Sequence, residues 1–259
     1  MDIAPPTPEP TETTVRYDRE RIRYALYGAA FLIAGIWAVW FGGWTLGWSM
    51  SDLGVVPRTL AGLAGIAFAP LAHASFDHLM SNTLPLAVLA TLMLYAYPRA
   101  ARIALPAIWL LSGLGVWLFA RESAHVGMSG VNHGLMFFLF LIGLLRRDRL
   151  GIAISLVVFF LWGGMLLTVL PREEHVSFEY HLAGAVVGLL AAITLFRLDP
   201  APARKRYSWE DEDDAPAPAD AELELPRPAQ VPVLWRGPST AEERGVILAF
   251  PRRRDEPPD

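Results

Sequence analysis

The sequence contains no cysteine among its 259 residues. Disulfide bonds and thiolate metal ligands are therefore excluded. Charged residues are also scarce, at 19% of the chain, whereas 53% of the residues are hydrophobic and the mean hydropathy is +0.34. Because the apolar residues occur in long blocks, this composition is too apolar for an ordinary soluble domain. It indicates a membrane protein.

The N-terminal residues lack the pattern of a secretory signal peptide. Residues 1–14 are rich in Pro, Thr and Glu, and no basic segment leads into an apolar core with a small-residue cleavage site. We therefore expect no removable signal. We expect residues 1–23 to form a disordered cytoplasmic segment.

Apolar runs predict an all-α membrane protein with six transmembrane helices over residues 24–197. The predicted spans are 24–44, 76–97, 103–119, 127–145, 151–170 and 180–196. Such runs approach the length of about 20 residues that crosses a hydrocarbon core of about 30 Å. The connection 45–75 contains another apolar stretch, but Pro57 and Pro70 interrupt it. We expect this stretch to form an interfacial or re-entrant segment.

The distribution of basic residues predicts the orientation. The outer loops carry three, which are Arg58, Arg121 and Arg172. The inner segments carry thirteen: Arg16, Arg19, Arg21, Arg23, Arg99, Arg102, Arg146, Arg147, Arg149, Arg197, Arg204, Lys205 and Arg206. An excess of basic residues marks the cytoplasmic side, so both ends of the chain are predicted to be cytoplasmic. The pattern fits a bacterial inner membrane.

Residues 198–259 differ in composition from the membrane domain. They contain an acidic run at 210–214 followed by Pro-rich sequence. We expect an acidic, Pro-rich cytoplasmic tail that is disordered. A short apolar patch at 246–250 is a candidate contact for a partner or for the membrane surface, although a fully solvated tail explains the composition as well.

Polar side chains occur near the outer ends of three predicted spans. His78 and Asn82 lie in the second span, Ser129 in the fourth and His181 in the sixth. With this topology all four lie within about two helical turns of the outer surface, at about 5.4 Å per turn. An ionisable residue inside a span is by default a functional-site hypothesis. We expect His73, which lies in the preceding connection, to be more peripheral.

Glycines predict that the fourth and sixth spans pack closely. They are Gly127, Gly130 and Gly134 in the fourth span and Gly184 and Gly188 in the sixth. Small residues four apart let two helix backbones approach each other in lipid. If the fourth span packs on the Gly184 face, Ser129 and His181 come within the separation of about 2.6–3.2 Å that a nucleophile and its base require.

Each of these features also has a structural interpretation. A serine at a helix start is usually an N-cap. A membrane histidine often pairs with a backbone carbonyl, and His78 and Asn82 would also serve helix packing. Their common depth, together with a nucleophile, a base and an amide donor, favours catalysis.

Three motifs together resemble the rhomboid family of intramembrane serine proteases. They are His78-Leu-Met-Ser-Asn82, Gly127-Met-Ser129-Gly130 and His181-Leu-Ala-Gly184-Ala-Val-Val-Gly188, on the second, fourth and sixth spans. The resemblance covers about residues 24–197. It implies that Ser129 is the nucleophile and His181 the general base and acid. It also implies that His78, Asn82 and the Ser129 N–H stabilise the oxyanion.

The resemblance further implies that the substrates are membrane proteins with a transmembrane helix. The fifth span would act as a side gate and residues 171–179 would cap the site. No motif calls for a metal, a cofactor or a nucleic acid. A non-catalytic rhomboid-like protein that binds membrane helices is one alternative, and a transporter or channel is another.

One residue departs from the family pattern. His133 stands four residues after Ser129, where the family often has an aromatic residue that packs on the catalytic histidine. Its position on the Ser129 face allows it to stack on His181 or to hydrogen bond to it. A buried packing role is the simpler alternative.

Overall fold

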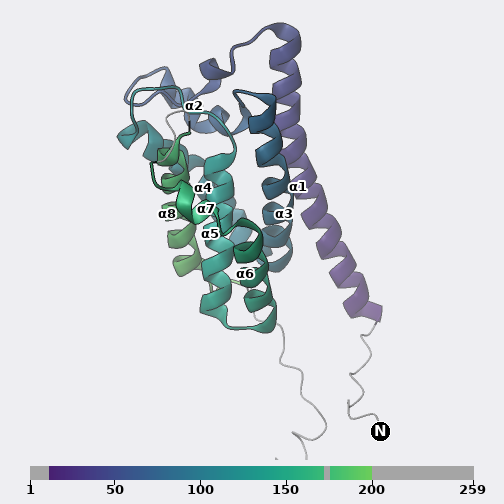
Figure 1. Ribbon diagram of the computed structural model, residues 1–259. Coiled ribbons are helices and arrows are strands. Elements are labelled where there is room, and N and C mark those ends of the chain that lie inside the picture. Colours follow the sequence, from purple (N-terminus) through teal and green to yellow (C-terminus); the bar gives the residue numbers. More distant parts are fainter. Residues whose placement is uncertain (1–11, 172–175, 200–259) are drawn as a thin grey trace, which may run out of the picture. The chain divides into compact units, whose positions relative to one another are not determined.

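The computed structural model describes residues 12–171 and 176–199, which form an all-α bundle (Figure 1). The long helices are α1 (Glu12–Leu46), α3 (Phe76–Ala96), α4 (Pro98–Phe119), α5 (Ser129–Arg146) and α8 (Phe178–Leu195). The shorter helices are α2 (Gly62–Phe68), α6 (Arg149–Trp162) and α7 (Met165–Thr168), with 3-10 turns η1 (Met50–Leu53) and η2 (Ala69–Leu71).

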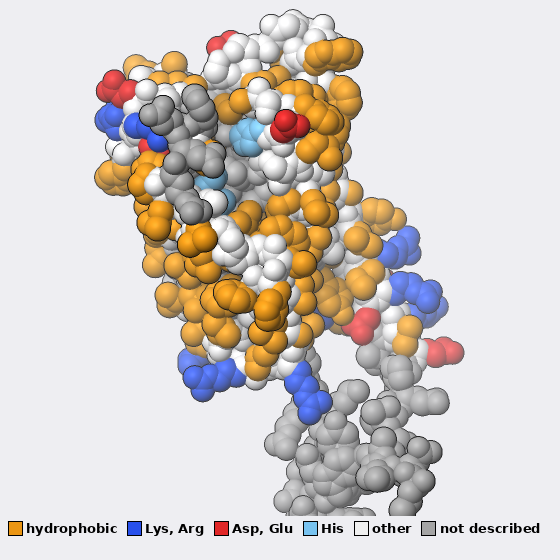
Figure 2. All heavy atoms as spheres, in the orientation of Figure 1, with side chains coloured by type: hydrophobic (Ala, Val, Ile, Leu, Met, Phe, Trp, Pro, Cys, Tyr) orange, Lys and Arg blue, Asp and Glu red, His pale blue; other side chains and the backbone are white. Residues whose placement is uncertain are grey.

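The five long helices are each long and apolar enough to cross a membrane. Large apolar side chains on the outer faces lack protein cover, as Phe31 (78% exposed) and Phe160 (79% exposed) illustrate. Figure 2 shows such side chains over much of the visible face of the bundle. Since water would disfavour so broad an apolar surface, the protein is an integral, multi-pass membrane protein.

The predicted fifth span, 151–170, is not one continuous helix. α6 ends at Trp162 after 14 residues, and the one-turn helix α7 begins at Met165. The break falls at Gly163 and Gly164, because paired glycines cost about 1 kcal/mol each in a helix relative to alanine. The predicted six-helix bundle is otherwise confirmed, with α6 and α7 together forming its fifth member.

The prediction that residues 1–23 are disordered is wrong for residues 12–23. These residues form the first turns of α1, while residues 1–11 and the predicted tail at 200–259 lie outside the described residues. The helix is anchored by Arg21, which donates a hydrogen bond to the Tyr95 carbonyl and lies over the rings of Tyr17 and Tyr95. These contacts stabilise the helical extension beyond the apolar run.

Helix α5 occupies the centre of the bundle. Its residues from Gly130 to Leu139 are all buried. Its closest neighbour is α8, because a Cβ at Gly184 would overlap the Gly130 carbonyl and a Cβ at Gly188 would overlap the Gly134 carbonyl. The predicted close packing of the fourth and sixth spans is therefore confirmed.

The two ends of the bundle differ in chemistry. At one end Arg146 lies over the Tyr97 ring and donates to the Asp199 carbonyl, and the Asp199 carboxylate accepts from the N–H groups of Arg99 and Ala100. We call this the arginine end; Arg side chains cluster there in Figure 2. The opposite end, the loop end, holds η1, α2, η2 and the first residues of α3, α5 and α8. The predicted interfacial segment in the connection 45–75 thus consists of short helical pieces at the loop end.

Candidate active site

Ser129 is the first residue of α5, and the segment before it is held in place by backbone contacts at the loop end. His125 pairs with Val55 as an isolated antiparallel bridge, and the Gly127 N–H donates to the Ala69 carbonyl at 2.8 Å. Gly127 has a φ of +114°, which disfavours a side chain, and a Cβ there would lie 2.6 Å from the His78 ring. Glycine at 127 therefore gives both the turn into α5 and room for His78.

His181 is in the first turns of α8 and is almost fully buried. Ser177 caps the start of α8, and its hydroxyl accepts a hydrogen bond from the Tyr180 N–H. The same hydroxyl lies 2.6 Å from His125 Nδ1, so the start of α8 is tied to the segment that precedes Ser129. Burial lowers the pKa of His125 below its ordinary value. This pKa favours a neutral ring in that contact.

His133 joins the Ser129 turn to His181. Its ring stacks on the His181 ring, with centroids 3.9 Å apart and planes 11° from parallel. Its Nδ1 donates to the Ser129 carbonyl at 2.7 Å, and its Nε2 lies 2.7 Å from the Thr168 hydroxyl. Of the roles considered for His133, the structure shows stacking in a buried position.

Ser129 and His181 therefore contact the same imidazole ring. The Gly130–Gly184 backbone contact lies directly beside them, at the same level of the α5–α8 interface. Among the described residues no hydrogen bond joins the Ser129 hydroxyl to His181. Hydrogen bonds of catalytic groups are often long in a site without substrate and tighten when the substrate binds.

His78 and Asn82 extend the site from α3. His78 is half-buried, and its ring lies beside Gly127. The Asn82 amide donates to the His78 carbonyl at 2.8 Å. Asn132 of α5 donates to the Asn82 side-chain oxygen at 3.0 Å and to its backbone oxygen at 3.1 Å. The Asn82 amide group has two hydrogens to donate, and among the described residues its acceptor is the His78 carbonyl.

The prediction that His73 is peripheral is wrong, because its ring is fully buried. His73 Nε2 accepts a hydrogen bond from the Met128 N–H at 3.3 Å, and the ring packs edge-on against His78 at 5.0 Å. Its Nδ1 donates to the Leu71 carbonyl at 3.3 Å. Burial, assisted by His78, lowers the pKa of His73 to about 4. A neutral ring is what an acceptor for the Met128 N–H requires.

The residues that the sequence analysis missed are His73, Asn132 and Thr168. His73 is five residues before His78, and Asn132 directly precedes His133, so proximity to a motif was a usable signal for both. Thr168 had no such signal, because it reaches the two stacked histidines only through the break between α6 and α7. Within the described ranges, no three metal-ligating side chains of His, Asp or Glu converge.

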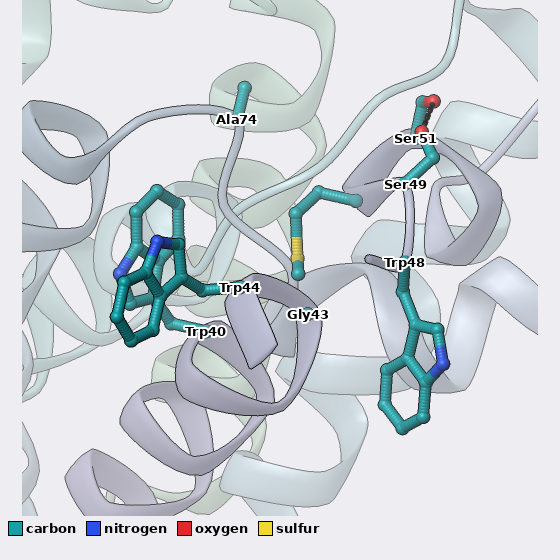
Figure 3. A pocket seen from close by; sticks show the side chains of 8 residues that line it. Trp40, Gly43, Trp44, Trp48, Ser49, Ser51 and Ala74 are labelled. Carbon is teal, nitrogen blue, oxygen red and sulfur yellow. Dashed lines mark hydrogen bonds between the residues drawn. The ribbon is translucent and has the colours of Figure 1, made fainter. Parts of the chain in front are cut away.

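A cavity of about 400 Å³ lies elsewhere at the loop end (Figure 3). Trp40 and Trp44 of α1 line one side of it and Trp48 lies opposite, with Ser49, Ser51 and Ala74 at its margin. None of the candidate catalytic side chains lines this cavity. Its tryptophans are typical of an aromatic belt at a membrane interface.

The sequence of this chain matches a model of a known protein family. The family model described as Rhomboid domain matches residues 61–198, which is more than half of the chain. The chain belongs to the rhomboid family. The matched region includes every candidate site residue of α3, α5 and α8, and the family is one of intramembrane proteases and protease-like proteins.

Similar proteins occur in mycobacteria. Uncharacterized proteins of Mycobacterium bovis and Mycobacterium tuberculosis are 37% identical over 216 residues, which cover 79% of this chain and 88% of theirs. An uncharacterized protein of Mycobacterium leprae is 38% identical over 152 residues, covering 55% of this chain and 59% of its own. The aligned residues thus cover most of the Mycobacterium bovis and Mycobacterium tuberculosis proteins and more than half of the Mycobacterium leprae protein.

Proposed function

We propose that this rhomboid protein is an intramembrane serine endopeptidase with Ser129 as nucleophile and His181 as base. One observation carries the proposal: the His133 ring bonds to the Ser129 carbonyl and stacks on His181. That arrangement, beside the Gly130–Gly184 contact, fixes the two reactive residues on facing turns. An isolated N-cap serine or packing histidine does not by itself account for one ring that connects Ser129 on α5 to His181 on α8.

The reaction follows from the chemistry of the two groups. The Ser129 oxygen forms a bond to the carbonyl carbon of the scissile peptide as its proton passes to His181 Nε2. The C–N bond then breaks, and His181 returns the proton to the leaving amine. Water hydrolyses the resulting acyl-enzyme by the same steps, with His181 again acting as base and then as acid. No metal or cofactor takes part in this scheme.

Three donors support the proposed oxyanion site. The His78 ring and the side-chain amide of Asn82 come from α3, and the Ser129 N–H is at the first turn of α5. N–H groups in the first turn lack partners within the helix and lie at its positive end. Removing one oxyanion donor typically lowers kcat by about 10²–10³.

The substrate class follows from the position of the site. The candidate residues lie at the loop ends of membrane-spanning helices, so the substrate is a membrane protein whose helix unwinds near that end. The arginine end faces the cytoplasm of a bacterial inner membrane, by the excess of basic residues on that side. The gate and cap expected at 151–179 stay predictions, since residues 172–175 lie outside the described residues.

A fluorophosphonate probe tests the nucleophile directly. Purified wild-type protein is expected to be labelled and to cleave a transmembrane-helix substrate in liposomes. Ser129→Ala and His181→Ala lose both properties. Ser51→Ala removes another serine at the loop end, outside the site, and keeps both. Cleavage by a folded Ser129→Ala protein would refute the proposal, and an unreactive folded wild type would favour the non-catalytic helix-binding alternative.

A further inference from the structure

Thr168 contacts both stacked histidines from a third element. Its backbone carbonyl accepts a hydrogen bond from His181 Nδ1 at 3.0 Å, and its hydroxyl lies 2.7 Å from His133 Nε2. Thr168 is the last residue of α7, the single helical turn that follows Gly163 and Gly164. α7 itself has no fully buried residue, so these hydrogen bonds are prominent among the contacts that hold it beside α5 and α8 (Figure 1).

The contact with the carbonyl defines the tautomer of His181. A carbonyl oxygen has no proton to give, so His181 Nδ1 carries the hydrogen. In the neutral ring Nε2 is then unprotonated and has its lone pair available. This is the tautomer that a general base for Ser129 requires, since the proton from the hydroxyl must arrive at Nε2.

The contact with the Thr168 hydroxyl fits a neutral His133 ring. His133 Nδ1 donates to the Ser129 carbonyl, so Nε2 of the neutral ring accepts the Thr168 hydroxyl proton. The Met165 carbonyl lies 3.0 Å from the same hydroxyl, which has one proton to share between these acceptors. A neutral His133 suits catalysis, because a cation stacked at 3.9 Å would oppose the imidazolium that forms on His181.

No carboxylate fills this role among the described residues. Glu179 is the acidic residue nearest to His181 in the sequence, and its carboxylate forms an ion pair with Arg121 at 3.6 Å. In serine hydrolases with a triad, a carboxylate accepts the Nδ1 hydrogen and holds the ring. Here the acceptor is a backbone carbonyl of α7.

We propose that Thr168 is the third, positioning member of the catalytic group. Its carbonyl fixes His181 as the Nδ1–H tautomer, and its hydroxyl holds His133 against the catalytic ring. The inference rests on the proposed function, and it makes activity depend on α7 being seated against α5 and α8. A shift of α7 removes both contacts together.

The tautomer is measurable without turnover. In protein with ¹⁵N-labelled histidine, the His181 signals, identified by their loss in His181→Gln, are expected to show a protonated Nδ1 and an unprotonated Nε2 near neutral pH. The opposite tautomer would overturn the inference even if the protein is an active protease. Because this readout needs no substrate, it separates the two proposals.

Kinetics test the hydroxyl contact. Thr168→Val keeps the carbonyl and the side-chain shape but removes the hydroxyl, so kcat is expected to fall about tenfold with KM unchanged. Thr168→Ser restores the hydroxyl and the rate. Thr194→Val is the matched control, because the Thr194 hydroxyl bonds only within α8, toward the arginine end. Unchanged kcat in a folded Thr168→Val protein would overturn the role of the hydroxyl.

If the Ser129→Ala protein remains active, the proposed function fails, regardless of the results for Thr168→Val and for the His181 tautomer. If Ser129→Ala is inactive while Thr168→Val is fully active and His181 has the opposite tautomer, only the further inference fails.

Discussion

Hydrogen bonds hold three histidine rings around Ser129. His181 donates through Nδ1 to the Thr168 carbonyl, and His133 donates through Nδ1 to the Ser129 carbonyl. His73 contributes in another way, because it accepts a hydrogen bond from the N–H of Met128, the residue before Ser129. Of the three contacts, the one made by His73 requires a neutral imidazole, because its Nε2 must accept a hydrogen bond. The geometry of the Ser129 turn therefore depends on a His73 ring that stays unprotonated.

His73 gives this dependence a measurable pH profile. Its pKa falls from 6.5 to about 4 on burial, so the unfolded chain takes up the proton first as the pH decreases. Stability that is present above pH 6.5 is therefore lost between pH 6.5 and about 4. At pH 5 the loss from this residue is about 2 kcal/mol, at 1.36 kcal/mol per pH unit.

We expect His73→Gln to be less stable than the wild type at pH 7.5, because glutamine fits the site less well. The difference is expected to narrow by about 2 kcal/mol at pH 5, since glutamine does not titrate. Thermal unfolding in detergent at several pH values measures the difference in stability at pH 7.5 and its decrease at pH 5. Parallel pH curves for the two proteins would contradict the role assigned to His73.

The sequence was informative for residues whose motif and partner lie on regular helices. These residues share one end of the bundle because successive spans alternate in direction, so that the second, fourth and sixth all begin at the same end: Ser129, His181, His78 and Asn82. The stacking of His133 could be anticipated from its spacing of four residues from Ser129. The contacts of Thr168 could not be anticipated, because they depend on the residue at which the helix resumes after the break between α6 and α7. Hydrophobic periodicity does not predict that residue.

At the scale of elements, the α5–α8 contact has the least tolerance for added volume. A Cβ at Gly184 would overlap the Gly130 carbonyl, and neither backbone is free to move within the buried centre. Gly184→Ala is expected to push the helices apart and cost about 1–3 kcal/mol of stability. It also separates Ser129 from His181, so proteolysis falls more than unfolding alone would explain.

Gly42→Ala is the matched control for this prediction. A Cβ there would meet the Trp48 ring at 3.5 Å, an ordinary contact, and alanine is the better helix former. Its melting temperature and activity are expected to equal or exceed those of the wild type. If Gly184→Ala were as stable and active as Gly42→Ala, the close approach of α5 and α8 would not matter for function.

Helix boundaries were the part of the fold that patterns predicted least well. The N-terminal turns of α1 are rich in charge, which suggested disorder, yet Arg21 finds a carbonyl and two tyrosine rings on the bundle. The predicted span 151–170 had sufficient hydrophobicity, but two glycines divide it. In the first case the contacts of Arg21 outweighed the high average charge of the segment. In the second case the low helix propensity of two glycines outweighed the high average hydrophobicity of residues 151–170.

For the whole molecule, the absence of cysteine offers a direct test of orientation. Ser51→Cys places a thiol at the exposed loop end, and Arg149→Cys places one at the exposed arginine end. In spheroplasts, whose outer membrane and cell wall have been removed but whose inner membrane is intact, a membrane-impermeant maleimide is expected to label Ser51→Cys. It should label Arg149→Cys only after the membrane is permeabilised. The reverse pattern would invert the proposed orientation.

The short length of α6 has a consequence for the lipid around the protein. Its 14 residues span about 21 Å, which is well below a hydrocarbon thickness of about 30 Å. Lipids beside a short apolar helix adapt by shortening their own layer, at a modest cost per ångström. We expect the bilayer to be thinner beside α6 than beside the longer helices, because the helix breaks at Gly163 and Gly164 before α7 adds a single turn. For a substrate helix of normal length we expect a mismatch with this thinner layer, which displaces part of the helix toward water before it meets Ser129.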